Sequence, residues 1–87
     1  MDGLAGEILA WALSRSERNV VSLTPRRVRK IARQRGERVD HLRVRRIIDQ
    51  VIEGLKKERR VLVRRRGKGT RVVYVLPPGA ESPYLEW

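Results

Sequence analysis

Residues 40–76 place an amphipathic helix directly before two short strands, and this succession limits the chain to a fold that mixes helices with a small sheet. Asp40 is a suitable N-cap for a helix that we expect over residues 41–59. The apolar residues in that range recur at helical spacing: Val44, Ile47, Ile48, Val51, Ile52 and Leu55. The stripe predicts one face packed against a core and an opposite face in solvent.

The first half of this helix has an unusual distribution of charge. His41, Arg43, Arg45 and Arg46 crowd a turn and a half, whereas helix N-termini ordinarily favour acidic side chains. An approaching polyanion would supply the missing negative charge, so the pattern favours a phosphate-binding helix over a merely solvated one. Arg43, Arg46 and Gln50 also have the chemistry to contact the edges of guanine and adenine.

Two strands are expected after the helix, at residues 61–66 and 70–76, because both are rich in β-branched residues. Gly67-Lys68-Gly69 joins them, and two registers are open. A two-residue turn would place Arg65 opposite Val72. We favour a three-residue loop, which places Arg65 opposite Arg71 and groups four valines on one face. These are Val61, Val63, Val73 and Val75.

The loop between these strands is crowded by cations: Arg64, Arg65, Arg66, Lys68 and Arg71. Like charges that face each other on neighbouring strands cost stability. Contact with phosphates would offset that cost, and we prefer this interpretation to one in which the charges only discourage edge-to-edge aggregation.

Two further helices with a short strand between them are expected in the first half of the chain, at residues 4–15 and from Pro25 onwards. The strand is the β-branched run 20–23. Thr24 is a suitable N-cap for the second helix, and Gly36 is suited to end it in a left-handed conformation. Its expected core side chains are Val28, Ile31 and Ala32. Its solvent side is basic: Arg26, Arg27, Arg29, Lys30 and Arg33.

The first helix has more apolar surface than one core-facing side requires. Leu4, Ile8, Trp11 and Ala12 make one stripe, while Leu9 and Leu13 make a second. We expect either the C-terminal tail, residues 77–87, or a second copy of the chain to cover the second stripe. The predicted homodimer would use Leu9, Leu13, Tyr84, Leu85 and Trp87.

Charge points to the class of partner. The 87 residues have a net charge of +11, and all 21 Lys and Arg residues lie between Arg15 and Arg71 with only six acidic residues, a local net charge of +15. A segment with this much positive charge favours the phosphate backbone of a nucleic acid as its partner. A membrane surface is a less favoured partner, because the aromatic residues do not form an apolar helix face. The absence of cysteine and of a long apolar run predicts a cytoplasmic, nucleoid-associated protein.

Catalytic chemistry has little support in the sequence. His41 is the single histidine and there is no cysteine, so neither a metal site nor a nucleophile with its base can be assembled from these residue types. The glycines do not have the spacing of a phosphate-binding loop. We therefore expect a binding protein without catalytic residues, cofactor or metal.

The order helix, short strand, helix, turn, helix and two-stranded hairpin resembles the winged helix-turn-helix family over residues 4–76. The matching segments are Thr24-Pro25-Arg26-Arg27-Val28, Val39 to Ile47, and Arg66-Gly67-Lys68-Gly69-Thr70, and the chain is most similar to small stand-alone archaeal DNA-binding proteins. The resemblance implies an α+β fold with residues 1–76 as the DNA-binding domain. It also implies that the third helix enters the major groove, the second crosses the backbone and the hairpin contacts phosphates or the minor groove.

Three functions remain open at this stage. A double-stranded DNA-binding protein, either a transcription regulator or a chromatin-type protein, is favoured. An RNA- or ribosome-associated winged helix and a protein-interaction module are the alternatives, and the scarcity of aromatic residues in the basic region argues against single-stranded RNA. The predicted nucleic-acid contacts are Arg26, Arg27, His41, Arg43, Arg45, Arg46, Gln50, Arg64, Arg65, Arg66, Lys68 and Arg71.

Overall fold

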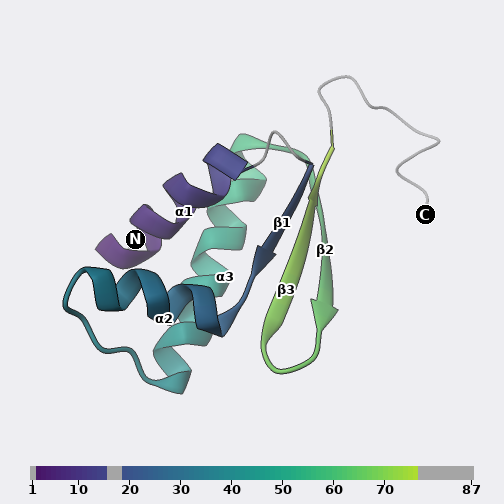
Figure 1. The fold of residues 1–87 in the computed structure, drawn as a ribbon. Coiled ribbons are helices and arrows are strands. Elements are labelled where there is room, and N and C mark those ends of the chain that lie inside the picture. Colours follow the sequence, from purple (N-terminus) through teal and green to yellow (C-terminus); the bar gives the residue numbers. More distant parts are fainter. Residues whose placement is uncertain (1, 16–18, 77–87) are drawn as a thin grey trace.

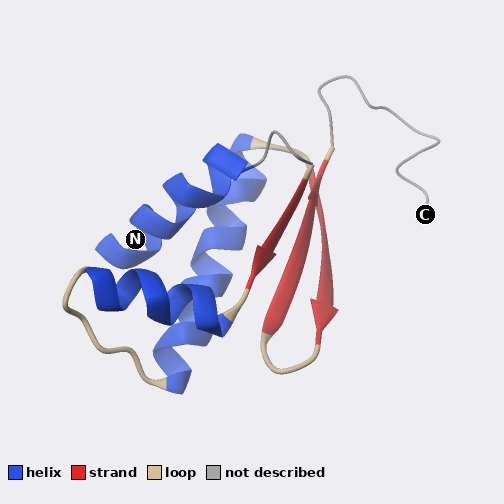
Figure 2. Ribbon diagram, in the orientation of Figure 1, coloured by secondary structure: helices blue, strands red, loops and turns tan. Residues whose placement is uncertain are grey.

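The structure is a computed structural model that describes residues 2–15 and 19–76. Over these residues it contains three helices and one three-stranded antiparallel sheet (Figure 1, Figure 2). The elements are α1 Gly3–Arg15, β1 Val20–Leu23, α2 Pro25–Gln34, α3 His41–Glu58, β2 Val61–Arg66 and β3 Thr70–Val75. The α+β class, the three helices and the small antiparallel sheet that the sequence predicted are confirmed, whereas the predicted tail, residues 77–87, lies outside the described residues.

Helices α2 and α3 begin at the two predicted caps. The Thr24 Oγ1 accepts a hydrogen bond from the Arg27 N–H at 3.0 Å, and the Asp40 Oδ1 accepts one from the Arg43 N–H at 2.8 Å. At the end of α2, Gly36 has a φ of +73°, and the Glu37 N–H donates to the Ala32 carbonyl at 2.9 Å. This left-handed closure satisfies the last carbonyls of α2 and turns the chain toward α3.

The sheet has the strand order β1-β3-β2, so β3 lies in the centre. Arg65 pairs with Arg71 and Val63 with Val73, which confirms the three-residue loop that the valine pattern favoured. Lys68 and Gly69 both have positive φ values, 63° and 79°, and reverse the chain between β2 and β3. The pairing of Val21 with Val73 extends the same apolar face to β1.

The core lies between this face of the sheet and the helices, which all stand on one side of it (Figure 2). Seven residues of α3 are buried, including Val44, Val51 and Leu55 at 1% exposure or less, so the predicted stripe is confirmed. Burying an aliphatic side chain of this kind stabilises the fold by roughly 1.5–3 kcal/mol. The core therefore fixes α3 between α1 and the sheet and leaves its other face in solvent.

The second apolar stripe of α1 is partly covered within the chain. Leu9 and Leu13 are half-buried and pack against the core cluster. Leu9 lies against Gly54 of α3 so closely that a methyl group on Gly54 would be 2.6 Å from the Leu9 Cδ2. The predicted homodimer therefore has less free apolar surface on α1 than the sequence indicated, and it stays a prediction.

Candidate nucleic-acid interface

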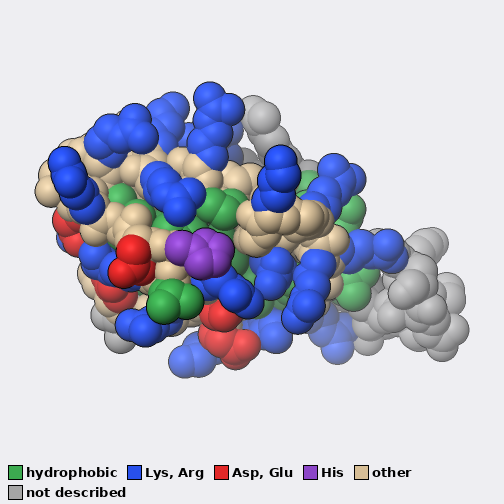
Figure 3. All heavy atoms as spheres, turned by 90° about the horizontal axis from the view of Figure 1, so that it is seen from below, with side chains coloured by type: hydrophobic (Ala, Val, Ile, Leu, Met, Phe, Trp, Pro, Cys, Tyr) green, Lys and Arg blue, Asp and Glu red, His purple; other side chains and the backbone are tan. Residues whose placement is uncertain are grey.

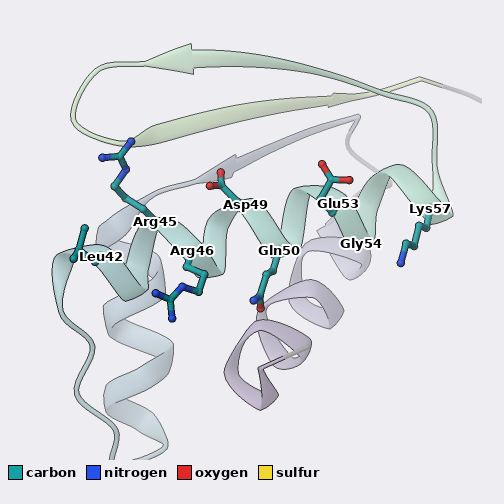
Figure 4. Close-up of a pocket in the computed structure, with 8 residues that line it drawn as sticks. All are labelled: Leu42, Arg45, Arg46, Asp49, Gln50, Glu53, Gly54 and Lys57. Atoms are coloured by element: carbon teal, nitrogen blue, oxygen red, sulfur yellow. The ribbon is translucent and has the colours of Figure 1, made fainter.

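The first two turns of α3 expose the side that lies away from the core residues Val44 and Ile47. His41, Leu42, Arg45 and Arg46 are exposed, and Leu42 retains 67% of its accessible surface. Figure 4 shows Arg45 on the side of the β2–β3 hairpin and Arg46 on the opposite side of the helix. Within the described residues, neither arginine forms an ion pair with a carboxylate.

The exposed face of α3 changes character along its length. Asp49 and Glu53 follow Arg45 at intervals of four residues, and both acidic side chains lie on the side of the hairpin (Figure 4). A shallow hollow runs along this face. Its lining is basic and apolar in the first turns of the helix, includes two carboxylates in the middle and ends in a lysine: Leu42, Arg45, Arg46, Asp49, Gln50, Glu53, Gly54 and Lys57. A polyanion is therefore attracted to the start of α3 and repelled from its middle.

The β2–β3 hairpin divides its cations between two faces. Arg65 and Arg71 are cross-strand neighbours, and Arg71 is also the neighbour of the buried Leu23 on β1. Both arginines therefore lie on the face of the sheet that bears the helices. Arg71 is half-buried, and its Nη1 donates to the Thr70 carbonyl at 3.2 Å. Arg64 and Arg66, two positions apart, lie on the outer face and are exposed, as is Lys68 in the loop.

The hairpin loop reaches the first turn of α2. A methyl group on Gly69 would lie 3.4 Å from the Pro25 Cγ. The loop, the start of α2 and the start of α3 consequently share one end of the molecule (Figure 1). Figure 3 looks at that end and shows the histidine in its middle, with Lys and Arg side chains spread around it. We call this surface the basic end and define it by its exposed side chains: His41, Arg45, Arg46, Arg64, Arg65, Arg66 and Lys68.

Arg43, by contrast, has carboxylate partners within the chain and is half-buried. Its guanidinium forms salt bridges with Asp2 at 3.2 Å and Glu37 at 3.1 Å, and its Nη1 donates to the Arg38 carbonyl at 3.4 Å. Arg35 continues the chain of charges, because it pairs with Glu37 at 3.0 Å and with Glu7 at 3.5 Å. We call these five residues the ion-pair cluster: Asp2, Glu7, Arg35, Glu37 and Arg43.

The ion-pair cluster ties the start of α1 to the α2–α3 turn and to α3. The Leu4 N–H donates to the Asp2 carboxylate at 2.8 Å, and this bond, together with the Arg43 guanidinium, lowers the pKa of Asp2 below its ordinary value of 3.8. The Gln50 Oε1 accepts from the Asp2 N–H at 3.4 Å. Arg43 and Gln50, both predicted to contact bases, are thus held toward α1, and we leave them out of the basic end.

Arg27 also differs from its sequence interpretation as a freely exposed cation. It is half-buried and its guanidinium carbon lies 5.0 Å from the centre of the Trp11 ring, while that of Arg15 lies 5.9 Å from the same ring. Such cation–π contacts hold a guanidinium in place. Trp11, expected in the core stripe of α1, therefore lies at the edge of the core beneath two arginines, and Arg26 is exposed beside them.

Two residues of the site were missed by the sequence interpretation. Leu42 is two positions before Val44, so it points to a different side of the helix from the apolar stripe. That spacing is the signal that would have marked Leu42 as exposed. The contact of Trp11 with Arg27 joins α1 to α2 across 16 positions, and no local pattern encodes it.

Comparison of the chain with protein-family models, with curated proteins and with solved structures gave no match. Across residues 2–15 and 19–76, every helix falls short of the length and apolar character that crossing a membrane requires. The same residues contain no group of three or more histidine and carboxylate side chains placed to hold a metal ion. The functional argument therefore rests on the side chains of the basic end.

Proposed function

We propose that the protein binds double-stranded DNA as a winged helix-turn-helix, with α3 as the recognition helix and the β2–β3 hairpin as the wing. The observation that carries the proposal is the convergence of cations without carboxylate partners, among the described residues, from α3 and the hairpin on one end of the fold. Cations that lack internal partners favour an external polyanion, because a phosphate contact releases condensed counterions from the DNA.

The shape of the basic end suits a B-form duplex. The major groove of B-DNA is about 12 Å wide and admits an α-helix. His41, Leu42 and Arg46 project from the first two turns of α3 and would meet base edges there. Arg64, Arg66 and Lys68 would contact the phosphates that flank the groove, since the hairpin loop stands beside the start of α3.

Acidic residues limit how far α3 enters the groove. Asp49 and Glu53 lie on the same side of α3 as Arg45, four and eight positions further along. Phosphates near either carboxylate would be repelled, so contact is confined to the start of the helix. This arrangement favours an end-on approach of α3, with Arg45 close to the backbone and Arg46 and Leu42 toward the bases. The proposal also places the protein with the nucleoid in the cytoplasm.

A competition between duplexes tests the proposal against the RNA alternative. The major groove of A-form RNA is deep and narrow and excludes a helix, so we expect duplex DNA to bind at least about tenfold more tightly than duplex RNA of matched sequence. Fluorescence anisotropy with labelled DNA and unlabelled competitors measures the ratio. Equal affinity for both duplexes, or tighter binding of RNA, contradicts the proposal, and binding of neither favours the protein-interaction module.

A further inference from the structure

A second basic surface lies on α2, away from the basic end. The helix has five cations and no acidic residue in ten positions. Val28, Ile31 and Ala32 face the core, and Arg26, Lys30 and Arg33 are exposed. At 100° per residue, these three cations lie half a helical turn from the buried side. Together with Arg27 and Arg15, whose guanidinium groups lie over Trp11, they form what we call the α2 surface.

The α2 surface and the exposed face of α3 point in opposite directions. In Figure 1, α2 lies in front of α3, so the side of α2 turned away from α3 faces the viewer. Figure 4 looks at α3 from the other side, with α2 behind it. A duplex that receives the start of α3 therefore touches α2 only through its first turn. Arg33 lies seven positions beyond Arg26, about 10 Å along the helix axis, and stays clear of that duplex.

Charge repulsion within α2 indicates that the α2 surface has an anionic partner of its own. Arg26 faces Lys30, and Lys30 faces Arg33, at the spacings of four and three residues that bring helix side chains together. Like charges at these spacings destabilise a helix. Within the described residues, Arg26, Lys30 and Arg33 form no ion pair, whereas nearby Arg35 pairs with Glu7 and Glu37.

The α2 surface is also shaped for a phosphate backbone. One hollow is lined by Thr24, Arg26, Arg27, Lys30 and Arg33. A second hollow continues from it past Trp11 and Arg15 to Ser22. The two hollows share Thr24 and Arg27, so cations and hydroxyl groups follow one another along a path from α2 to the end of α1. An extended path of this kind suits the successive phosphates of a nucleic-acid backbone better than a single small anion.

We propose that the α2 surface binds the backbone of a second DNA duplex, so that one molecule bridges two duplexes. The inference rests on the proposed function, because it assigns the first duplex to the basic end. Contacts on the α2 surface involve phosphates alone, since its described cations lie along the side of α2 and at the end of α1 and would meet a duplex side-on. Bridging is therefore independent of the sequence of the second duplex and sensitive to salt.

A bridging assay with charge-matched variants tests this inference. One duplex is immobilised on beads, and the capture of a second, fluorescent duplex is measured with and without the full-length protein. The α2 variant has Lys30→Gln and Arg33→Gln, and it keeps Arg26 because the first turn of α2 touches the first duplex. The control variant has Lys57→Gln and Arg59→Gln, which removes the same charge at the far end of α3. Thermal unfolding confirms that both variants fold, and anisotropy gives their affinity for a single short duplex.

We expect the α2 variant to keep its affinity for a single duplex within about threefold and to capture the second duplex at least about tenfold less than wild type, since two phosphate contacts are lost. The control variant should match wild type in both measurements. Capture by the α2 variant at the wild-type level overturns the inference, and so does a parallel loss of single-duplex affinity, which would assign the α2 surface to the first site. A wild-type protein that binds one duplex but captures none overturns bridging alone, whereas absence of any duplex binding overturns the proposed function.

Trp11 supplies a second, local measurement. The chain has two tryptophans, so Trp87→Phe leaves Trp11 as the single indole. A phosphate that draws Arg27 away from the ring changes the surroundings of this indole. We expect Trp11 emission to change only after the basic end is saturated, as the second equivalent of duplex is added. An emission that stays constant through two equivalents contradicts the inference.

Discussion

Arg43 and Arg45 stand two positions apart on α3, yet one belongs to the ion-pair cluster and the other to the basic end. Arg43 is clamped by Asp2 and Glu37, and Arg45 has no carboxylate partner in the described residues. Two positions rotate a helical side chain by about 200°, so the neighbours of the two arginines come from different elements. Whether an arginine stabilises the fold or remains open to a polyanion is decided by where the acidic residues lie.

The ion-pair cluster supports the basic end. Asp2 directly precedes α1, Glu7 lies in α1 and Glu37 lies in the α2–α3 turn, so the cluster joins the start of the chain and this turn to Arg43 of α3. Its members keep a quarter to a half of their side-chain surface exposed, so each pair contributes modestly and the geometry matters more than the energy. Variants of the ion-pair cluster should therefore lower stability and leave DNA affinity nearly unchanged, whereas variants of the basic end should lower DNA affinity and leave stability unchanged.

The largest effect is expected in the hairpin. Arg64→Gln, Arg66→Gln and Lys68→Gln together remove three phosphate contacts, and duplex affinity should fall on the order of 100-fold at physiological salt. The melting temperature should not fall, because these exposed cations repel one another. The control is Arg35→Gln with Arg43→Gln, for which we expect a lower melting temperature and an affinity within about threefold of wild type. A loss of duplex affinity in the control variant as large as that in the hairpin variant would contradict the separation of the ion-pair cluster from the basic end.

Arg46→Ala should have the next largest effect. If Arg46 contacts a base edge, its loss costs about 1–3 kcal/mol of binding free energy and flattens the preference among duplex sequences. Arg66→Ala is the comparison, because a phosphate contact weakens binding to every sequence alike. A selection from a random duplex library, repeated with each variant, measures both outcomes. Uniform weakening by both variants would favour a chromatin-type protein over a transcription regulator.

Leu42 gives a smaller and chemically specific effect. Its side chain is 67% exposed, and in the proposed complex it would contact the methyl group of a thymine in the major groove. Replacing thymine by uracil in the duplex should weaken wild-type binding about fourfold, roughly 0.8 kcal/mol for one buried methyl group. In Leu42→Ala the two duplexes should bind equally. A uracil effect that persists in the variant would assign the preference to DNA shape.

The smallest effect on DNA binding is expected at Asp2, where stability should depend on pH. Because the pKa of Asp2 is lowered in the folded protein, its contribution to stability is complete above the ordinary value of 3.8 and is lost as pH falls through the folded value. Asp2→Asn should melt below wild type near about pH 6, and the difference should vanish in strong acid. Melting curves across this range provide the measurement, and a difference that is constant with pH would exclude the carboxylate as its cause.

Local signals made most of the fold predictable. Thr24 and Asp40 mark helix starts because their side-chain oxygens accept backbone N–H groups, and Gly36 marks a helix end through its positive φ. The valines of β2 and β3 fix the register through a period of two. The role of Arg43 was not predictable, because Asp2 is 41 positions away and only the packing of α1 on α3 brings them together. The contact of Arg27 with the Trp11 ring was not predictable for the same reason, because the two residues lie on different helices. Proximity in the sequence shows where the cations gather, but only the fold separates those that have carboxylate partners from those that do not.

The central claim, that the basic end neutralises duplex phosphates, is tested most directly by the salt dependence of wild-type binding. If the first turns of α2 and α3 and the hairpin together contact roughly 6 to 8 phosphates, log K against log salt concentration should have a slope of about −5 to −7 on B-DNA. Anisotropy titrations of one short duplex over a range of salt concentrations give that slope. A slope shallower than about −2 would mean that at most two phosphates are contacted, and it would contradict the account.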